Sequence, residues 1–172
     1  MFQLKTIKKQ KKYRRDFEGM GEGLVLLKVE SEVKNAGYNY HLFYRNGKKP
    51  PLDIAINPND FSIEYASFFL QDELIRVENG ISEIVYSDDN LLIFSEGFTI
   101  DTTNLSFTKD FEVFFSENNL IILEAGIKNS VCGYSLTEAN YILVAENNNI
   151  VGLALKNISL NEMKVLREVK VI

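Results

Sequence analysis

The sequence contains one histidine, His41, and one cysteine, Cys132. A Ser–His–acid or Cys–His site would have to use His41, because activating a nucleophile near neutral pH usually needs a base of that kind. His41 stands among tyrosines in YNYHLFY and Cys132 lies in an apolar neighbourhood, which is typical of a strand histidine and of a small buried thiol. We therefore expect no catalytic role for either residue, with a His41–Cys132 pair as the alternative.

Carboxylates are the remaining side chains that could do acid–base chemistry. Adjacent pairs stand at Asp72–Glu73 and Asp88–Asp89. Glycoside hydrolysis, however, needs two carboxyl groups that face each other across a substrate at about 5 to 9 Å, which adjacency in the chain does not supply. A zinc site with several His or Cys ligands is excluded because the chain has only two such residues. The run Asp88-Asp89-Asn90 lacks the ligand spacing of a calcium loop, so we expect no metal and no cofactor.

The distribution of charge divides the chain into two parts. The stretch KTIKKQKKYRR, residues 5–15, holds seven cations and no acid. Residues 1–20 carry a net charge of +5, whereas residues 21–172 carry −10. We interpret residues 1–20 as a basic N-terminal arm and residues 21–172 as a single acidic, β-rich domain. The glycines of GMGEG (19–23) precede an apolar segment instead of following a strand, so we interpret them as a hinge and not as a phosphate-binding loop.

The arm is the one unusual charge feature, and several roles remain open for it. Its candidate binding residues are Lys8, Lys9, Lys11, Lys12, Tyr13, Arg14 and Arg15. Cations interleaved with an aromatic side chain suit single-stranded nucleic acid, with strong salt dependence. The arm could instead dock on a protein, on a second copy or on its own acidic body, or form a solvated end. Its apolar edge is too short for membrane insertion, and nucleic acid would bind only here, since the body is acidic.

Short Asn- and Asp-rich runs between apolar segments predict a fold built from hairpins. These turns are ENG (78–80), SDDN (87–90), SENN (116–119) and ENNN (146–149). We expect three hairpins, which pair 73–77 with 81–86, 111–115 with 120–125 and 141–145 with 150–155. Further strands are expected at 24–31, 38–44, 52–56, 91–94 and 98–107. The spacing predicts about ten short antiparallel strands in a sandwich or barrel-like sheet.

Two segments have helical features. Ser159 followed by Glu162 forms a capping-box signature, so we expect a helix over 159–169 with Leu160 and Leu166 on its packed side. The segment 59–73 fits either a strand or a helix that Asp60 caps, and the pattern slightly favours a second helix near 60–73. The predicted fold class is therefore mainly β, formally α+β.

These expectations favour a binding module over an enzyme. An acidic body without a recognisable catalytic set suits an inhibitor or immunity-type protein that masks a basic protein partner, since complementary charge speeds association. One alternative is a small hydrolase-like enzyme that uses carboxylates or His41, in a barrel lined by Tyr38, Tyr40 and Tyr44. The other is a structural subunit assembled through sheet edges as a homo-oligomer. One cysteine and no apolar run near 20 residues predict a soluble, cytoplasmic protein without a membrane partner.

Overall fold

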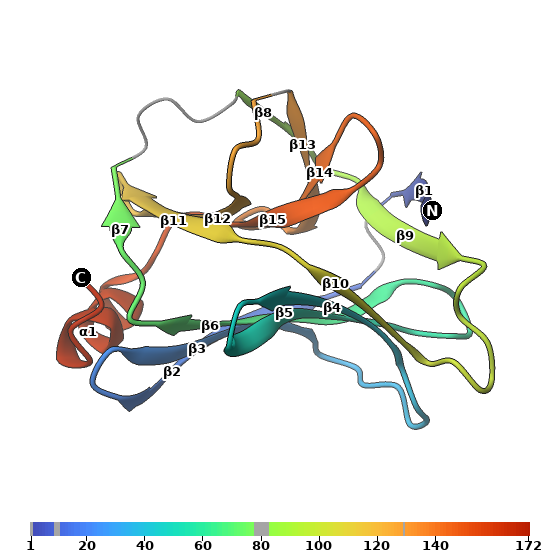
Figure 1. Ribbon diagram of the computed structural model, residues 1–172, viewed down its shortest axis with the longest axis horizontal. Coiled ribbons are helices and arrows are strands. Elements are labelled where there is room, and N and C mark those ends of the chain that lie inside the picture. Colours follow the sequence, from blue (N-terminus) through green and yellow to red (C-terminus); the bar gives the residue numbers. More distant parts are fainter. Residues whose placement is uncertain (1, 9–10, 78–82, 129) are drawn as a thin grey trace.

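The computed structural model describes residues 2–8, 11–77, 83–128 and 130–172. These residues form fifteen strands in three sheets and one C-terminal helix. The two large sheets lie as separate layers, with a two-stranded sheet at one side and the helix at the opposite side (Figure 1). The prediction of a mainly β sandwich with a C-terminal helix is confirmed. The sheets do not close into a barrel, and more strands form than expected.

The six-stranded sheet is the lower layer in Figure 1. Its neighbours are antiparallel except for β10 and β4, which are parallel. The strands, in spatial order, are β10 (Asn104–Thr108), β4 (Tyr40–Asn46), β5 (Lys49–Ile56), β6 (Ile63–Gln71), β3 (Leu24–Ser31) and β2 (Tyr13–Gly21).

The seven-stranded sheet is the upper layer, and both of its edge strands are parallel to their neighbours. Its strands, in spatial order, are β7 (Ile75–Arg76), β11 (Phe111–Ser116), β12 (Asn119–Glu124), β15 (Ile150–Leu155), β14 (Asn140–Ala145), β13 (Val131–Thr137) and β8 (Ile84–Ser87). The small sheet pairs β1 (Phe2–Ile7) with β9 (Asn90–Ser95) in antiparallel fashion.

Strands of the upper sheet are apolar on both faces because a core lies on each side. Successive residues of a strand point to opposite faces. In β12, Leu120 and Ile122 join the main core between the two large sheets, whereas Ile121 and Leu123 join a second cluster on the other face. The continuous apolar runs in the sequence thus mark strands that are buried on both sides.

The second helix expected near 60–73 is wrong, because this segment forms β6 in the middle of the six-stranded sheet. Ala66, Phe68 and Leu70 are buried between the sheets, and Tyr65 and Ser67 alternate with them on the opposite face. The two-residue period of the strand prevails because β6 pairs with both β5 and β3. Pairing with two neighbours is a tertiary effect that local propensity does not report.

Two of the three expected hairpins are confirmed, β11–β12 and β14–β15. The third is wrong, because β7 and β8 lie at opposite edges of the seven-stranded sheet. Its expected turn, 78–80, falls outside the described residues. The run 87–90 is not a hairpin turn either, since β8 and β9 belong to different sheets. Of the expected strand 98–107, only the last part is β10, and Ile100 is 86% exposed.

The C-terminal helix α1 (Leu160–Glu168) is confirmed, with Ser159 as the N-cap and the complete capping box. Leu166 is buried, but Leu160 is 87% exposed and does not lie on the packed side. The glycine hinge is also corrected: Gly19 and Gly21 lie in β2, and a tight turn follows into β3. Within the described residues no helix is both long enough and apolar enough to cross a membrane.

Gly152 in β15 provides a test of how closely the central strands pack. Its φ is +155°, and a Cβ atom there would overlap the backbone oxygen of Ile122 in β12. We expect Gly152→Ala to lower the free energy of unfolding by about 3 kcal/mol or more, because overpacking and backbone strain add. Urea unfolding followed by circular dichroism measures the change.

Gly126→Ala is the matched control for this substitution. Gly126 also has a positive φ, +81°, but no neighbouring atom lies within 4 Å of its virtual Cβ. The free energy of unfolding of this variant should fall by only about 1 to 2 kcal/mol, because alanine has to adopt the left-handed backbone conformation but meets no neighbouring atom. Equal losses for the two variants would contradict the close packing of β15 against β12.

Candidate functional site

The basic segment of the sequence is folded into the sheets and forms specific contacts. Tyr13 in β2 is buried, and its hydroxyl donates to the backbone oxygen of Ile63 over 2.7 Å. Burial raises the pKa of this phenol, and nearby carboxylates raise it further. Arg14 donates to Glu30 through Nε and Nη2. Lys8 and Lys12 are exposed, and Lys9 lies outside the described residues.

Arg15 has the most complete set of contacts in this segment. Its Nε and Nη2 donate to the two carboxylate oxygens of Glu162 in α1 over 2.8 and 2.7 Å. Nη1 donates to the Asn140 side chain and to the Lys156 carbonyl, both over 2.8 Å, and Nη2 also reaches the Asn157 carbonyl. All five N–H donors of the guanidinium are therefore used. With its side chain only 11% exposed, Arg15 has a structural role.

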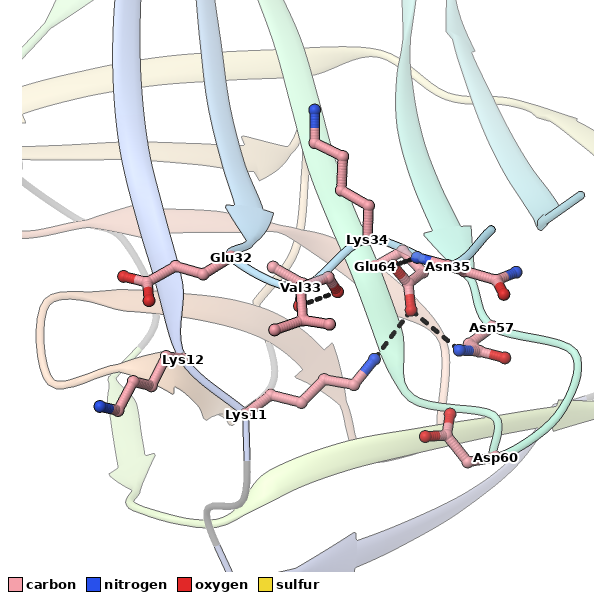
Figure 2. Close-up of a pocket in the computed structure, with 10 residues that line it drawn as sticks. Lys11, Lys12, Glu32, Val33, Lys34, Asn35, Asn57, Asp60 and Glu64 are labelled. Carbon is pink, nitrogen blue, oxygen red and sulfur yellow. Dashed lines mark hydrogen bonds and ion pairs between the residues drawn. The ribbon is translucent and has the colours of Figure 1, made fainter. Parts of the chain in front are cut away.

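Lys11 reaches into a pocket of about 450 Å³ at the end of the six-stranded sheet (Figure 2). The centre of this pocket is the carboxylate of Glu64, whose side chain is 4% exposed. Lys11 Nζ and Asn57 Nδ2 donate to Glu64 Oε1 over 2.8 and 3.0 Å, and the Asn35 backbone N–H donates to Oε2 over 3.2 Å. The contacts join three connections between strands, so we call this the Glu64 pocket.

The chemistry of the Glu64 pocket favours a structural role over a ligand site. Its lining holds three lysines and three carboxylates, so no net charge selects an anion or a cation. Lys12 and Lys34 point away from Glu64 in Figure 2. Burial alone would raise the pKa of Asp60, but hydrogen bonds from Ser62 and the charge of Lys11 lower it below its usual range. The Asp60 carboxylate is thus stabilised as an anion by partners within the chain.

The structure does not bring His41 and Cys132 together. His41 lies in β4, in the lower layer, where its Nδ1 is 2.9 Å from an oxygen of Asp53. The Tyr65 hydroxyl donates to the other oxygen of Asp53 over 2.7 Å. Cys132 lies in β13, in the upper layer, and is exposed, so the prediction of a buried thiol is wrong. It alternates with buried neighbours and pairs with exposed Val85 of the edge strand β8.

The carboxylate pairs that the sequence singled out do not form a facing pair. Glu73 binds Lys49 over 2.9 Å, and Asp72 follows the last residue of β6 with a φ of +51°. Asp88 and Asp89 lie in the bend between β8 and β9. Among the residues that the structure places, no group of three or more His, Cys, Asp or Glu side chains could hold a metal ion.

A second concave site is lined by aromatic rings, and we call it the aromatic cleft. Its volume is about 480 Å³. The rings of Tyr40 and Phe98 stack at 4.5 Å, and those of Phe61 and Phe94 lie at 4.4 Å. The lining consists of Phe2, Gln3, Tyr40, Phe61, Phe94, Ser95, Glu96 and Phe98.

Phe61 is held in a backbone conformation that bulky residues rarely adopt. Its φ is +63°, in the left-handed region, which is unfavourable for a residue with a large side chain. Two backbone hydrogen bonds fix this geometry: the Phe61 N–H donates to Asn57, and the Phe61 carbonyl accepts from Ile93. The result is that the Phe61 ring lies against Phe94 in the cleft. Such strain concentrates at sites with a function.

Sequence reasoning missed the aromatic cleft, because its residues come from separate segments. Of the tyrosines proposed to line a barrel, Tyr40 lines the cleft and Tyr44 is buried in the main core. Phe2 belongs to β1, Phe94 to β9, and Phe61 to the connection that precedes β6. The twelve phenylalanines and eight tyrosines of the chain were the one signal that could have pointed to such a site.

Arg15→Lys tests the structural role of the guanidinium. Lysine cannot reproduce the paired bonds to Glu162, so we expect a loss of about 2 to 3 kcal/mol at pH 7. Urea unfolding measures the loss. Arg14→Lys is the control, because Arg14 is largely exposed, and it should change stability far less than Arg15→Lys does. Similar losses for both would show that Arg15 is no more than a surface cation.

The same variant should also change the dependence of stability on pH. Burial alone would raise the pKa of Glu162, but hydrogen bonds from Arg15 and the Ser159 backbone lower it below its ordinary value of 4.5. A lowered folded-state pKa stabilises the protein above pH 4.5, and this stability is lost as the pH falls through the folded-state pKa. Unfolding between pH 6 and pH 3 should therefore show a smaller acid-dependent loss for Arg15→Lys than for the wild type.

Lys11→Met tests whether the Glu64 pocket is a structural unit. Removing the ammonium leaves a buried carboxylate with neutral donors only, so we expect a loss of about 2 kcal/mol. Lys12→Met, at an exposed position, is the control and should have little effect. The double variant Lys11→Met/Glu64→Gln should regain part of the loss in urea unfolding, because the unpaired charge is gone. Strictly additive losses would refute this coupling.

No protein-family model matches the chain, and no curated protein is detectably similar to it in sequence. Similarity to a characterised protein therefore assigns neither a family nor a function. The lining of the aromatic cleft is what remains to indicate a ligand.

Proposed function

We propose that the protein is a binding module for a basic protein partner, and that one side chain of this partner inserts into the aromatic cleft. The observation that carries the proposal is the left-handed conformation of Phe61, whose ring completes the cleft. Phe61 packs against the main core and is only partly buried, so the strain also provides a preformed surface that a recognition site can use. The volume of about 480 Å³ is within the usual range of ligand sites.

A cationic side chain suits the chemistry of the cleft. Aromatic ring faces attract ammonium and guanidinium groups. Within the chain, the Lys5 ammonium already lies 5.1 Å from the centre of the Phe94 ring. Glu96, at the rim, is exposed and supplies a negative charge. An arginine or lysine of the partner would bury its aliphatic stem between the rings and keep its charge near Glu96.

The charge of the whole chain supports a basic partner. Its formal net charge is −5, so a basic protein would be attracted from a distance and would associate faster. The form of this function that we propose is an inhibitor or immunity-type protein that masks a basic enzyme in the cytoplasm. The exposed free thiol of Cys132 is compatible with a reducing compartment. Nucleic-acid binding through the basic N-terminal arm (1–20), a hydrolase and a structural subunit stay predictions.

Selection of peptides from a random 12-residue phage library on the immobilised protein tests the proposal. We expect the enriched peptides to carry net positive charge and to contain arginine or lysine next to apolar residues. A synthetic copy of the strongest binder is then titrated against the protein by fluorescence polarisation. Enrichment of acidic or neutral peptides would overturn the proposal of a basic partner.

Phe61→Asn separates a role in binding from a role in stability. Asparagine tolerates the left-handed conformation, so the relief of strain should offset lost packing and keep the stability within about 1 kcal/mol of the wild type. Affinity for the selected peptide should fall at least about tenfold, because one wall of the cleft is removed. Leu160→Ala, at a fully accessible helix position, is the control and should bind like the wild type. Unchanged binding by Phe61→Asn would exclude the cleft as the site.

A further inference from the structure

The turn between β4 and β5 contains an asparagine followed by a glycine. Asn46, the last residue of β4, pairs with Lys49, the first residue of β5, so Gly47 and Lys48 alone form the turn. The φ of Gly47 is +64°, which suits the first position of a two-residue hairpin turn. Both turn residues are exposed, and no atom beyond the chain neighbours lies within 4 Å of the virtual Cβ of Gly47. The surroundings of the turn are therefore open.

An asparagine side chain can react with the backbone nitrogen of the residue that follows it. This nitrogen attacks Cγ of the asparagine and loses its proton, and the side-chain amide nitrogen leaves as ammonia, which closes a five-membered succinimide ring. Water then opens the ring at one of its two carbonyl groups and gives aspartate or isoaspartate. A side chain on the following residue hinders the attack, whereas glycine has no side chain and lets the two groups approach closely.

The two groups that would react are only weakly held by the fold. Ladder bonds of a two-residue hairpin join the residues that flank the turn, and no described group accepts a hydrogen bond from the Gly47 N–H. The Asn46 side chain forms one hydrogen bond with the described residues, in which its Oδ1 accepts from the Phe111 N–H over 3.4 Å. A donor at this oxygen polarises the amide carbonyl and stabilises the oxyanion that the attack creates.

Cations on both sides of the Asn-Gly pair favour the reaction further. Arg45 precedes the pair, and Lys48 and Lys49 follow it. Lys49 binds Glu73 over 2.9 Å, whereas Arg45 and Lys48 are exposed. The Gly47 nitrogen has to lose its proton to attack, and nearby positive charge stabilises the anion that forms. The turn is therefore locally basic in a chain whose formal net charge is −5.

Other asparagines of the described chain lack this combination of features. Asn140 is 3% exposed, and its Oδ1 and Nδ2 form hydrogen bonds of 2.8 and 2.7 Å. Asn148 is exposed in a turn, but the nitrogen that follows it, that of Asn149, donates to the Asn147 side chain over 3.2 Å. A second Asn-Gly pair, at 79–80, falls outside the described residues.

We propose that Asn46 is a site of spontaneous deamidation, in which the Gly47 nitrogen attacks Asn46 Cγ and ammonia is released. The aspartate product places a carboxylate opposite Lys49 in the pair that closes the hairpin. The isoaspartate product adds one methylene group to the backbone at this two-residue turn. Both products alter the contact with Phe111, through which Asn46 joins the six-stranded sheet to the first residue of β11.

Peptide mapping of the full chain by mass spectrometry tests the site, because replacement of –NH₂ by –OH changes the mass and fragment ions locate the change. The protein is incubated folded and, in parallel, unfolded in guanidinium chloride, at several pH values. We expect folded Asn46 to convert at no less than about a tenth of the rate in the unfolded chain, since exposed turns open at little cost in free energy. The rate should rise with pH. Folded Asn140 and Asn148 are internal controls and should convert more slowly than Asn46.

Two variants verify the chemistry, and circular dichroism verifies that both fold. Asn46→Gln keeps an amide but would have to close a six-membered ring, so the conversion at this position should disappear. Lys48→Gln removes an exposed cation without changing the reacting atoms and should slow the conversion at least about twofold. The proposal is overturned if Asn46 stays unchanged in the folded protein while the unfolded chain converts, or if the conversion slows as the pH rises. An unchanged rate in Lys48→Gln would refute the role of the cations.

Discussion

The hydrogen bonds of the Arg15 guanidinium are the interaction on which the assembly of the layers depends. Arg15 belongs to the six-stranded sheet, Asn140 to the seven-stranded sheet and Glu162 to helix α1. One planar group with five donors and no acceptor thus joins three elements that come from different parts of the chain. Because the side chain is almost fully shielded from water, a shift of any one element would leave buried donors without partners. The two large sheets and helix α1 are therefore held in fixed relative positions at this end of the sandwich.

Pairing of charged groups within the chain also explains how a basic segment is accommodated in an acidic protein. Arg14 binds Glu30 across the β2–β3 hairpin, Lys11 binds Glu64, which lies 53 residues later in the sequence, and both carboxylates are mostly buried. The opposite charges of the chain are thus used for packing at this side of the molecule. The strain at Phe61 has the reverse character, since it costs free energy and yields a preformed cleft.

The parts of the fold that could be predicted from the sequence are those with a local signal. Ser159 and Glu162 form a capping box within one helical turn, and the Asn-rich turns define the β11–β12 and β14–β15 hairpins. The parallel pairs β4–β10, β7–β11 and β8–β13 join distant segments, and no local pattern encodes such a pairing. Residues 61–71 carry aromatic side chains that satisfy both a helical and a strand period, so only the neighbouring strands decide.

The candidate site was less predictable than the fold, for the same physical reason. The basic residues drew attention because they are contiguous, yet Arg15 and Lys11 bind other parts of the chain. The aromatic cleft combines side chains from β1, β4, β9 and two connections, which have no common spacing in the sequence. Composition reveals that aromatic residues are abundant, but their meeting in one cleft follows from the topology.

The position of Arg15 in the chain has a consequence for synthesis on the ribosome. Its partners lie 125 to 147 residues later, so β2 emerges long before the groups that its guanidinium needs. At about 5 to 20 residues per second, the six-stranded sheet has seconds to form while this corner stays open. A nascent chain that stalls before α1 would therefore present an unsatisfied cation at the end of its sheet. The hydrogen bonds of Arg15 are therefore completed only when helix α1 has formed.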